Sequence, residues 1–481
     1  MITLEQKLYN WYLKTPDNIA LVDNKNTVNY KTLFESIFSI KIYLKNIHGI
    51  SKGDNVILSA NKTISFIYSY FAIHLLAAKV VPIDEQISDK ILNYIIKKTK
   101  PKLLVGIDNK INNINTIPFE VFENIKIIKP SNINFPTNNI AADILFTTGT
   151  SGDPKGVVLT NKNITQSTIN INSFLRNNNS DSELLLMPFS HSFGLARLRC
   201  ILFGGGKVVL INGIANLKRM FRMLYDFNIT GFGIVPSAWN YIKKMTGDSL
   251  GNFSNQLRYI ELGSAFMSLQ EKKYIMRLLP KTRICMHYGL TEASRSTFLE
   301  FHEDKLYLNT VGKSSPNVKI GIFDNIGIKL PNNIEGEICI KGDHVSKKYL
   351  NLNINDYNFK GYFRTGDLGL FNDEGYLILK GRTLDQINVG GKKVSPIEVE
   401  NKIIEFDNRL DVACVGVPDP NGVLGEVVKA FIVKVDFDVD FNKINNFLDK
   451  NLEKYKIPFE YEWITNIPRT SSGKIKRQKL K

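Results

Sequence analysis

Short apolar runs alternate with stretches of helical periodicity in this sequence, and the alternation limits the possible folds more than any other feature. A helical repeat that includes Leu33 and Ile37 is followed by β-rich runs at 55–58 and 80–83. Similar runs, typical of buried strands, follow at 103–107, 144–147, 183–187, 207–211 and 229–235. Strands separated by helices indicate βαβ units around a mainly parallel sheet, so the predicted fold class is α/β.

The composition changes twice toward the C-terminus. Between 311 and 379 the chain is β-like and rich in turns, which predicts a β-rich subdomain. After Gly381 the pattern starts again, with helices expected at 396–405 and 442–452 and strands expected at 412–417, 427–435 and 460–464. Because 481 residues exceed one typical domain, we expect a large N-terminal domain at 1–381 and a small α+β C-terminal domain at 386–481.

The chain carries 62 basic and 46 acidic side chains, a formal charge of +16. A surplus of this size raises the question of a nucleic-acid or membrane partner. The lysines are spread among asparagine and isoleucine from end to end, and the one dense cluster lies at 474–481. We therefore interpret the surplus as a bias of residue usage and expect no nucleic-acid partner.

The cysteines and the apolar segments exclude further classes. The four cysteines, at 200, 285, 339 and 414, have neither CxxC nor Cys/His ligand spacing, so no disulfide framework and no zinc site is expected. No stretch of about 18 or more apolar residues occurs, and the first residues lack the pattern of a signal peptide. We expect a cytoplasmic protein without a membrane span.

A run rich in glycine, threonine and serine follows the apolar strand at 144–147. It reads Thr147-Thr148-Gly149-Thr150-Ser151-Gly152-Asp153-Pro154-Lys155-Gly156. Its backbone N–H groups, hydroxyl groups and single lysine can surround phosphate oxygens, although a loop of this composition often serves only as a connection. The Walker A spacing is absent, which disfavours a P-loop nucleotide hydrolase.

Five further segments follow this loop in order. They are Met187–Gly194 (MPFSHSFG), His287–Glu292 (HYGLTE), Tyr362–Gly369 (YFRTGDLG), Gly381-Arg382 and Pro468–Ile475 (PRTSSGKI). Together with the loop, they resemble the adenylate-forming superfamily, which includes acyl-CoA synthetases, AMP-dependent synthetases and ligases, nonribosomal peptide synthetase adenylation domains and firefly luciferase. The resemblance covers nearly the whole chain. It implies an ATP-dependent, AMP-forming acid–thiol ligase with a hinge at 382–385 and a mobile C-terminal domain.

The resemblance also implies roles for individual residues. Thr291 contacts the α-phosphate, Glu292 holds Mg²⁺, Tyr288 stacks on adenine and Asp367 holds the ribose hydroxyls. Lys474 bridges the substrate carboxylate and the phosphate, then withdraws so that a thiol can attack. Alone, each residue has a simpler interpretation, such as a core tyrosine, a turn aspartate or a tail lysine; their joint order argues against it. The expected nucleotide contacts are Thr147, Thr148, Gly149, Thr150, Ser151, Gly152, Lys155, Gly263, Ser264, Ala265, His287, Tyr288, Gly289, Thr291, Asp367, Arg382 and Lys474.

The motif spacing also implies an acyl pocket. Its expected residues are His191, Ser192, Leu195, Gly233, Leu262, His287, Arg295 and Ser296. This set is fairly polar, so we expect a short or functionalised acid rather than a long fatty chain, with a second polar or anionic group facing Arg295. Two of these roles have a simpler alternative. His191 is expected among the catalytic residues, but it could instead be a core histidine whose hydrogen bonds are satisfied. Arg295 could instead be an ordinary surface residue.

Three positions depart from the family pattern. Met286 stands where an asparagine or glutamine commonly contacts the adenine amino group, so adenine recognition rests on the backbone and on stacking. The hinge position after Arg382 carries Leu384, followed by Asp385, and the pivot is expected at one of these two residues. No aspartate lies beside His191, which disfavours an α-amino acid as substrate.

The sequence leaves the acyl acceptor open. Coenzyme A is favoured, and a phosphopantetheinyl acyl carrier protein, supplied as a separate chain, offers the same thiol. A third hypothesis is an inactive binding protein of the same fold, which the retention of Glu292, Asp367, Arg382 and Lys474 argues against. ATP and Mg²⁺ are the expected cofactors, and nothing in the sequence indicates the oligomeric state.

Overall fold

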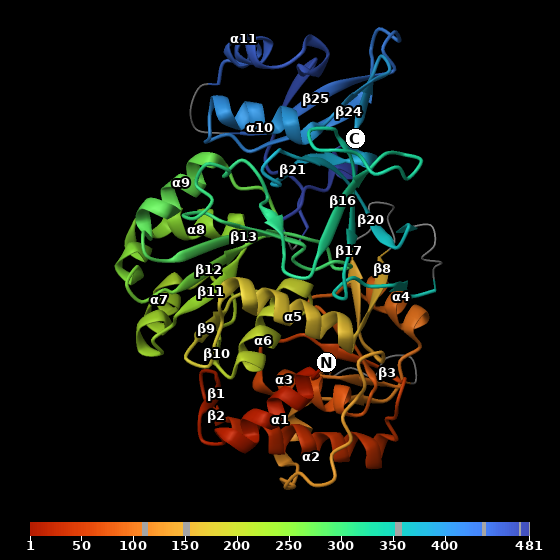
Figure 1. Ribbon diagram of the computed structural model, residues 1–481, viewed down its shortest axis with the longest axis vertical. Coiled ribbons are helices and arrows are strands. Elements are labelled where there is room, and N and C mark those ends of the chain that lie inside the picture. Colours follow the sequence, from red (N-terminus) through yellow and green to blue (C-terminus); the bar gives the residue numbers. More distant parts are fainter. Residues whose placement is uncertain (108–113, 148–153, 352–357, 435–438, 471–472, 481) are drawn as a thin grey trace.

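The computed structural model describes residues 1–107, 114–147, 154–351, 358–434, 439–470 and 473–480. They form a large N-terminal domain built on two extensive sheets, and a small C-terminal domain at one end of the molecule (Figure 1). In spatial order, the nine-stranded sheet consists of β15 (Lys313–Ser314), β14 (Thr297–Glu300), β13 (Arg283–Tyr288), β12 (Tyr259–Leu262), β11 (Gly231–Ile234), β9 (Ser182–Leu185), β10 (Lys207–Leu210), β1 (Ile19–Val22) and β2 (Thr27–Asn29). The seven-stranded sheet consists of β18 (Lys348–Tyr349), β8 (Lys155–Thr160), β7 (Ala141–Thr147), β4 (Lys79–Ile83), β3 (Asn55–Ser59), β5 (Leu103–Val105) and β6 (Thr116–Ile117).

Helices cover both faces of these sheets. The layer between the sheets contains α1 (Leu4–Lys14), α2 (Tyr30–His48), α3 (Ile64–Leu75), α5 (Asn161–Leu175) and α6 (Ser192–Gly204). The outer layers contain α4 (Asp89–Thr99) on the seven-stranded sheet and α7 (Leu217–Asp226), α8 (Pro236–Thr246) and α9 (Leu269–Leu278) on the nine-stranded sheet.

The strand β3 shows why this layering suits the sequence. Val56 and Leu58 pack in the core between the sheets, whereas Ile57 packs beneath α4. Successive side chains of a strand point to opposite faces, so a continuous apolar run is buried on both sides. The central pairings β3–β4 and β3–β5 are parallel. The α/β prediction is therefore confirmed, and no helix in the described ranges is long and apolar enough to cross a membrane.

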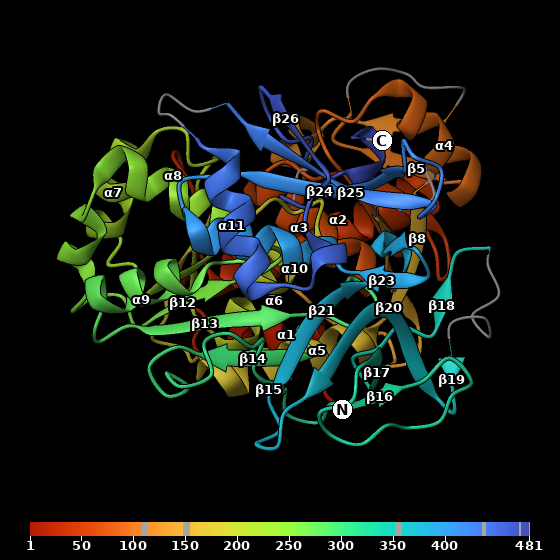
Figure 2. The same ribbon diagram turned by 90° about the horizontal axis from the view of Figure 1, so that it is seen from above.

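The β-rich subdomain and the C-terminal domain follow the predicted order. The subdomain sheet contains β16 (Lys319–Phe323), β17 (Gly336–Lys341), β19 (Asn358–Phe359), β20 (Tyr362–Phe371) and β21 (Leu377–Arg382). The 3₁₀ turn η4 (Thr383–Asp385) then leads into the small domain. That domain contains β22 (Ile387–Val389), β23 (Lys392–Val394), α10 (Pro396–Phe406), β24 (Val412–Pro418), β25 (Glu426–Val433), α11 (Phe441–Asn451) and β26 (Glu460–Ile464). Seen from above, it lies over the large domain (Figure 2).

A buried charge cluster ties the first helix to β7, the strand that precedes the phosphate loop. His74 Nδ1 lies 3.1 Å from Glu5 Oε1, and His74 Nε2 lies 3.0 Å from Asp143 Oδ1 in β7. Tyr70 and Arg199 also donate hydrogen bonds to Asp143. Burial alone would lower the pKa of His74, but hydrogen bonds to the two carboxylates raise it to about 9.

We expect the free energy of unfolding to fall as the pH rises through about 9, where the buried His74 loses its proton. The folded pKa lies above the ordinary value of 6.5, so the stabilisation is complete below that value and is lost above the folded pKa. A pKa shift of this size corresponds to a stabilisation of the folded protein by at most about 3 kcal/mol. Urea unfolding at about pH 6 and about pH 10 should show a larger loss for the wild type than for His74→Gln; equal losses would contradict the assignment.

Candidate functional site

Three parallel strands of the nine-stranded sheet end beside each other and lead into predicted site segments. The strands β11, β12 and β13 end at Ile234, Leu262 and Tyr288. The segment 263–265 follows β12, and the segment 288–292 begins at the end of β13. Ligands of open α/β sheets bind at the carboxyl ends of the strands, so this edge is the candidate active site.

Tyr288 meets the β-rich subdomain in a buried hydrogen-bonded group. Its hydroxyl donates a hydrogen bond of 2.7 Å to Asp367 Oδ2, and Arg382 Nε donates one of 2.9 Å to Asp367 Oδ1. Burial and the nearby carboxylate raise the pKa of Tyr288, so the hydroxyl remains a donor. Each carboxylate oxygen of Asp367 keeps a second lone pair, which can accept a hydrogen bond from a ribose hydroxyl.

Glu292 is held by a tyrosine that the sequence analysis missed. The Tyr349 hydroxyl donates a hydrogen bond of 2.6 Å to Glu292 Oε1, and Lys155 Nζ lies 6.0 Å from the centre of the Tyr349 ring. Tyr349 lies in β18, which pairs with β8, the strand that begins at Lys155. The tyrosine therefore links the predicted metal ligand to the end of the phosphate loop. No motif marks it, because it reaches the site only through this strand pairing.

The predicted catalytic lysine follows a tight turn near the C-terminus. The Thr470 N–H donates to the Lys474 carbonyl over 2.7 Å, and the Lys474 N–H donates to the Thr470 hydroxyl over 3.1 Å. Gly473 has a φ of +84°, which residues with a side chain rarely adopt. A methyl group added to Gly473 would lie 3.7 Å from Ser237 Oγ in α8, so the turn lies against the large domain.

Charged side chains from both domains converge on Lys474. Although the residue is solvent-exposed as a whole, enough protein surrounds its ammonium group for burial to lower the pKa of Lys474. The Arg382 guanidinium lowers this pKa further, while Asp367 and Glu292 raise it. Burial lowers the pKa of His191, and Lys474 adds to that shift. The structure thus brings together five predicted site residues from distant parts of the chain.

Several expected acyl-pocket residues are buried beyond the reach of a ligand, which corrects the sequence interpretation. Leu195 and Leu262 are 0% exposed and pack in the hydrophobic core. Ser296 is also 0% exposed, and its hydroxyl donates to the Ala293 carbonyl over 2.9 Å. His191 and Ser192 remain partly exposed.

Arg295 does not face open space, contrary to the expectation that it meets an anionic group of the acid. It is 2% exposed, and its Nε donates to Glu261 Oε1 over 2.9 Å. Its terminal nitrogens donate to the carbonyls of Ser192 and Phe193 over 3.4 and 3.3 Å. The sequence analysis also missed Glu261, although a single carboxylate within the apolar run 259–262 was a usable signal.

Three further findings concern the phosphate loop, the adenine site and the predicted hinge. Thr148, Gly149, Thr150, Ser151 and Gly152 lie outside the described residues. Met286 packs in the core on the α7–α9 side of the sheet. At the hinge, Asp385 Oδ2 lies 3.7 Å from Arg477 Nε, so η4 faces the segment that carries Lys474.

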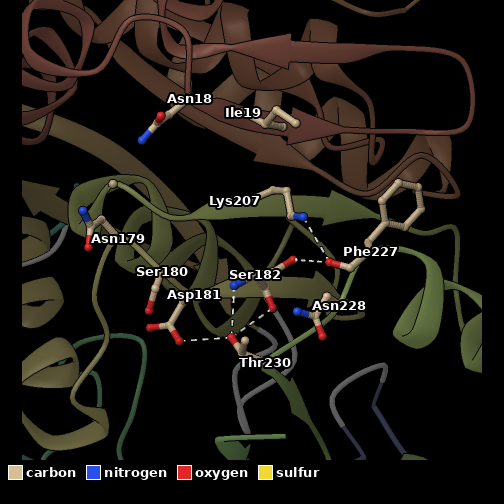
Figure 3. Close-up of a pocket in the computed structure, with 11 residues that line it drawn as sticks. Asn18, Ile19, Asn179, Ser180, Asp181, Ser182, Lys207, Phe227, Asn228 and Thr230 are labelled. Atoms are coloured by element: carbon tan, nitrogen blue, oxygen red, sulfur yellow. Dashed lines mark hydrogen bonds between the residues drawn. The ribbon is translucent and has the colours of Figure 1, made fainter. Parts of the chain in front are cut away.

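A hollow at the opposite edge of the same sheet is a competing candidate (Figure 3). Ser182, Lys207 and Thr230 line it, at or just before the amino ends of β9, β10 and β11. Lys207 Nζ donates to the Phe227 carbonyl over 3.0 Å, and the Thr230 hydroxyl donates to Asp181 Oδ1 over 3.0 Å. These polar groups have protein partners and lie away from the predicted segments, so we assign no catalytic role to the hollow.

Comparisons with known proteins agree with this geometry. The family described as AMP-binding enzyme matches residues 8–350, and the AMP-binding enzyme C-terminal domain matches residues 398–474. Oxalate–CoA ligase of Saccharomyces cerevisiae is 31% identical over 382 residues, which are 76% of this chain and 68% of that protein. A 2-succinylbenzoate–CoA ligase of Bacillus licheniformis is 28% identical over 480 residues, 97% of each chain.

A solved structure shares the whole architecture. O-succinylbenzoate coenzyme A synthetase (MenE) from Bacillus subtilis, in complex with ATP and magnesium ion, is 25% identical, with a TM-score of 0.86. The match covers 98% of this chain and 98% of that chain. The likeness therefore extends over both domains.

Proposed function

Because this chain belongs to the AMP-binding enzyme family, we propose that it activates a short, functionalised carboxylic acid with ATP and passes the acyl group to coenzyme A. The enzyme class is that of an AMP-forming acid–thiol ligase, and its co-substrates and cofactor are ATP, coenzyme A and Mg²⁺. The observation that carries the proposal is the convergence of Lys474 on Glu292, Asp367 and Arg382.

Glu292 fits the binding of Mg²⁺. In the described part of the chain, no group of three or more histidine, cysteine or acidic side chains could hold a metal ion. Mg²⁺ commonly takes one or two carboxylates and completes its shell with water and substrate phosphates, so a single carboxylate suffices. The Tyr349 hydrogen bond holds this carboxylate, and the same tyrosine ring lies near Lys155. When bound, the ion supplies positive charge that screens the phosphates.

In the first half-reaction, a carboxylate oxygen of the acid bonds to the α-phosphorus of ATP and pyrophosphate leaves. Two anions approach each other, so positive charge must be placed between them. The Lys474 ammonium group supplies it, while Tyr288 and the Asp367–Arg382 pair hold the adenosine. No nucleophilic side chain is needed, because the bound acid is itself the nucleophile.

In the second half-reaction, the coenzyme A thiolate attacks the acyl carbon and AMP leaves. Lys474 is then no longer needed between carboxylate and phosphate, and its withdrawal gives the thiol room to approach. The turn η4, with Leu384 and Asp385, is the pivot that we propose for this movement of the small domain. We propose that His191 lies on the acyl side of the site, and its partial exposure and the electrostatic effect of Lys474 on it support this role.

The proposed acid class rests on the relatives and on the packing of the pocket. The two relatives described above are named as ligases of oxalate and of 2-succinylbenzoate, neither of which carries a long fatty chain. In this chain the ring of Phe193 packs on Gly233 and the ring of His287 packs on Gly263, which fills space beside the ends of β11 and β12. A long fatty chain would need that space.

The test is ATP–pyrophosphate exchange over a panel of acids, followed by product analysis. We expect exchange that depends on one class of short acid, and a thioester when coenzyme A is added. No exchange with any acid would favour an inactive binding protein. A thioester formed on an acyl carrier protein, with none on coenzyme A, would overturn the proposed acceptor.

A further inference from the structure

Two rings pack against glycines at the carboxyl ends of β11 and β12, where the acyl pocket is predicted. A methyl group added to Gly263 would lie 2.1 Å from His287 Cε1, and one added to Gly233 would lie 2.9 Å from Phe193 Cε2. Such distances leave no room for a larger residue at either glycine. The two rings meet edge to face, with centroids 4.9 Å apart. We call Phe193 and His287 the pocket wall.

A single carboxylate lies directly behind this wall. Glu261 is 0% exposed, and its Oε1 lies 2.7 Å from His287 Nδ1 and 2.9 Å from Arg295 Nε. Its Oε2 accepts a hydrogen bond of 3.2 Å from Arg197 Nη1. The Arg295 guanidinium also lies 4.6 Å from the centre of the Phe193 ring. Glu261 therefore contacts His287 directly and is linked to the Phe193 ring through Arg295.

The charges behind the wall compensate each other. Arg197 also pairs with Glu183, which accepts a hydrogen bond from Tyr259 as well. Within the described residues, this cluster contains two carboxylates and two guanidinium groups. Burial alone would raise the pKa of Glu261, but Arg295 and the other neighbouring groups hold it well below its usual range, so Glu261 stays charged. Burial and Arg295 lower the pKa of His287, so its ring is neutral near pH 7.

We propose that Glu261 is a positioning residue that determines acid specificity. By pairing with Arg295 and fixing His287, it keeps the deep end of the pocket closed and electrically neutral. The wall then selects an acid whose remote end is short and uncharged. A second carboxylate at that end would lose its hydration and gain no free cation, because the nearest guanidinium groups already pair with Glu261 and Glu183. This inference rests on the proposed function, since it concerns the acid of the same reaction.

The test compares the binding of two acyl-sulfamoyl adenosines, which mimic the acyl-adenylate and need no turnover. One carries a propanoyl group and the other a succinoyl group, which ends in a second carboxylate. We expect the wild type to bind the propanoyl analogue more tightly. In Glu261→Gln the Arg295 charge is left uncompensated, so the affinity ratio should move at least about tenfold toward the succinoyl analogue.

Glu183→Gln is the matched control. It removes the same charge from the same buried cluster, yet Glu183 contacts neither His287 nor Arg295 among the described contacts. Its affinity ratio should stay within about threefold of the wild type. The double variant Glu261→Gln/Arg295→Met removes the freed cation and should restore the preference for the propanoyl analogue.

Each outcome separates the inference from the proposed function. If neither analogue binds the wild type, the proposed function fails. If both bind and Glu261→Gln leaves the ratio of their affinities unchanged, the inference is wrong. A shift of equal size in Glu183→Gln also overturns it.

If Glu261→Gln fails to fold, the variant Arg295→Met provides the test instead. It removes the cation while Glu261 stays, so its affinity ratio should move at least about tenfold further toward the propanoyl analogue. An unchanged ratio there contradicts the role of this pair.

Discussion

Replacing Lys474 with alanine should slow adenylate formation at least about 100-fold, because the charge that screens two approaching anions is lost. Transfer from preformed acyl-adenylate to coenzyme A should change by less than about threefold, since the lysine has withdrawn before that step. The two half-reactions are measured separately, by acid-dependent ATP–pyrophosphate exchange and by thioester formation from synthetic acyl-adenylate.

Lys476→Ala provides the control for this variant. It removes the same charge two residues further along the same terminal segment, just beyond the predicted motif Pro468–Ile475. We expect its exchange rate to stay close to that of the wild type. If Lys474→Ala instead impaired both half-reactions equally, the small domain could not be alternating between two roles.

Replacing Asp367 with alanine should lower kcat/KM for ATP at least about 100-fold. The substitution removes the acceptor proposed for the ribose and leaves the Arg382 guanidinium and the Tyr288 hydroxyl without their shared partner. KM for the acid should change much less, because the proposed role of Asp367 is to hold the nucleotide and not the acid. Steady-state kinetics with each substrate varied in turn would separate the two effects.

The neighbouring pair of Glu337 and Arg364 allows a matched comparison. Arg364 Nε and Nη2 donate to Glu337 over 2.9 and 2.7 Å, in the same sheet as Asp367. Glu337→Ala therefore disturbs a similar ion pair of the β-rich subdomain without removing the predicted ribose acceptor. If Glu337→Ala lowered kcat/KM for ATP as much as Asp367→Ala does, the effect would belong to the subdomain as a whole and not to Asp367.

In the C-terminal domain, local sequence patterns predicted the secondary structure well. The helices predicted at 396–405 and 442–452 are observed as α10 and α11, each within about one residue at either end. The strands β24, β25 and β26 were also predicted within about two residues, whereas β22 and β23 had no predicted bounds. These elements combine clear periodicity with strong boundary signals, such as Pro396 at the first position of α10 and the capping Asp440 before α11.

The sequence did not predict which strands pair with each other. The strands β12 and β13 are short and carry Glu261 and His287 within apolar surroundings, so neither was predicted. The pairing of β18 with β8, which brings Tyr349 to Glu292, joins segments far apart in the chain. Periodicity reports which face of a strand is apolar, but it carries no information about the neighbouring strand.

By itself, the sequence determined the class of fold and the family, and it predicted which charged residues hold the nucleotide, because these depend on periodicity and on contiguous motifs. The tertiary structure alone decided what those residues face. It brought Lys474 to Glu292 and Asp367, and it paired Arg295 with Glu261 rather than leaving it to the acid. Whether a charge is free or compensated depends on which charges lie beside it in space, and these come from strands and loops that no local pattern connects.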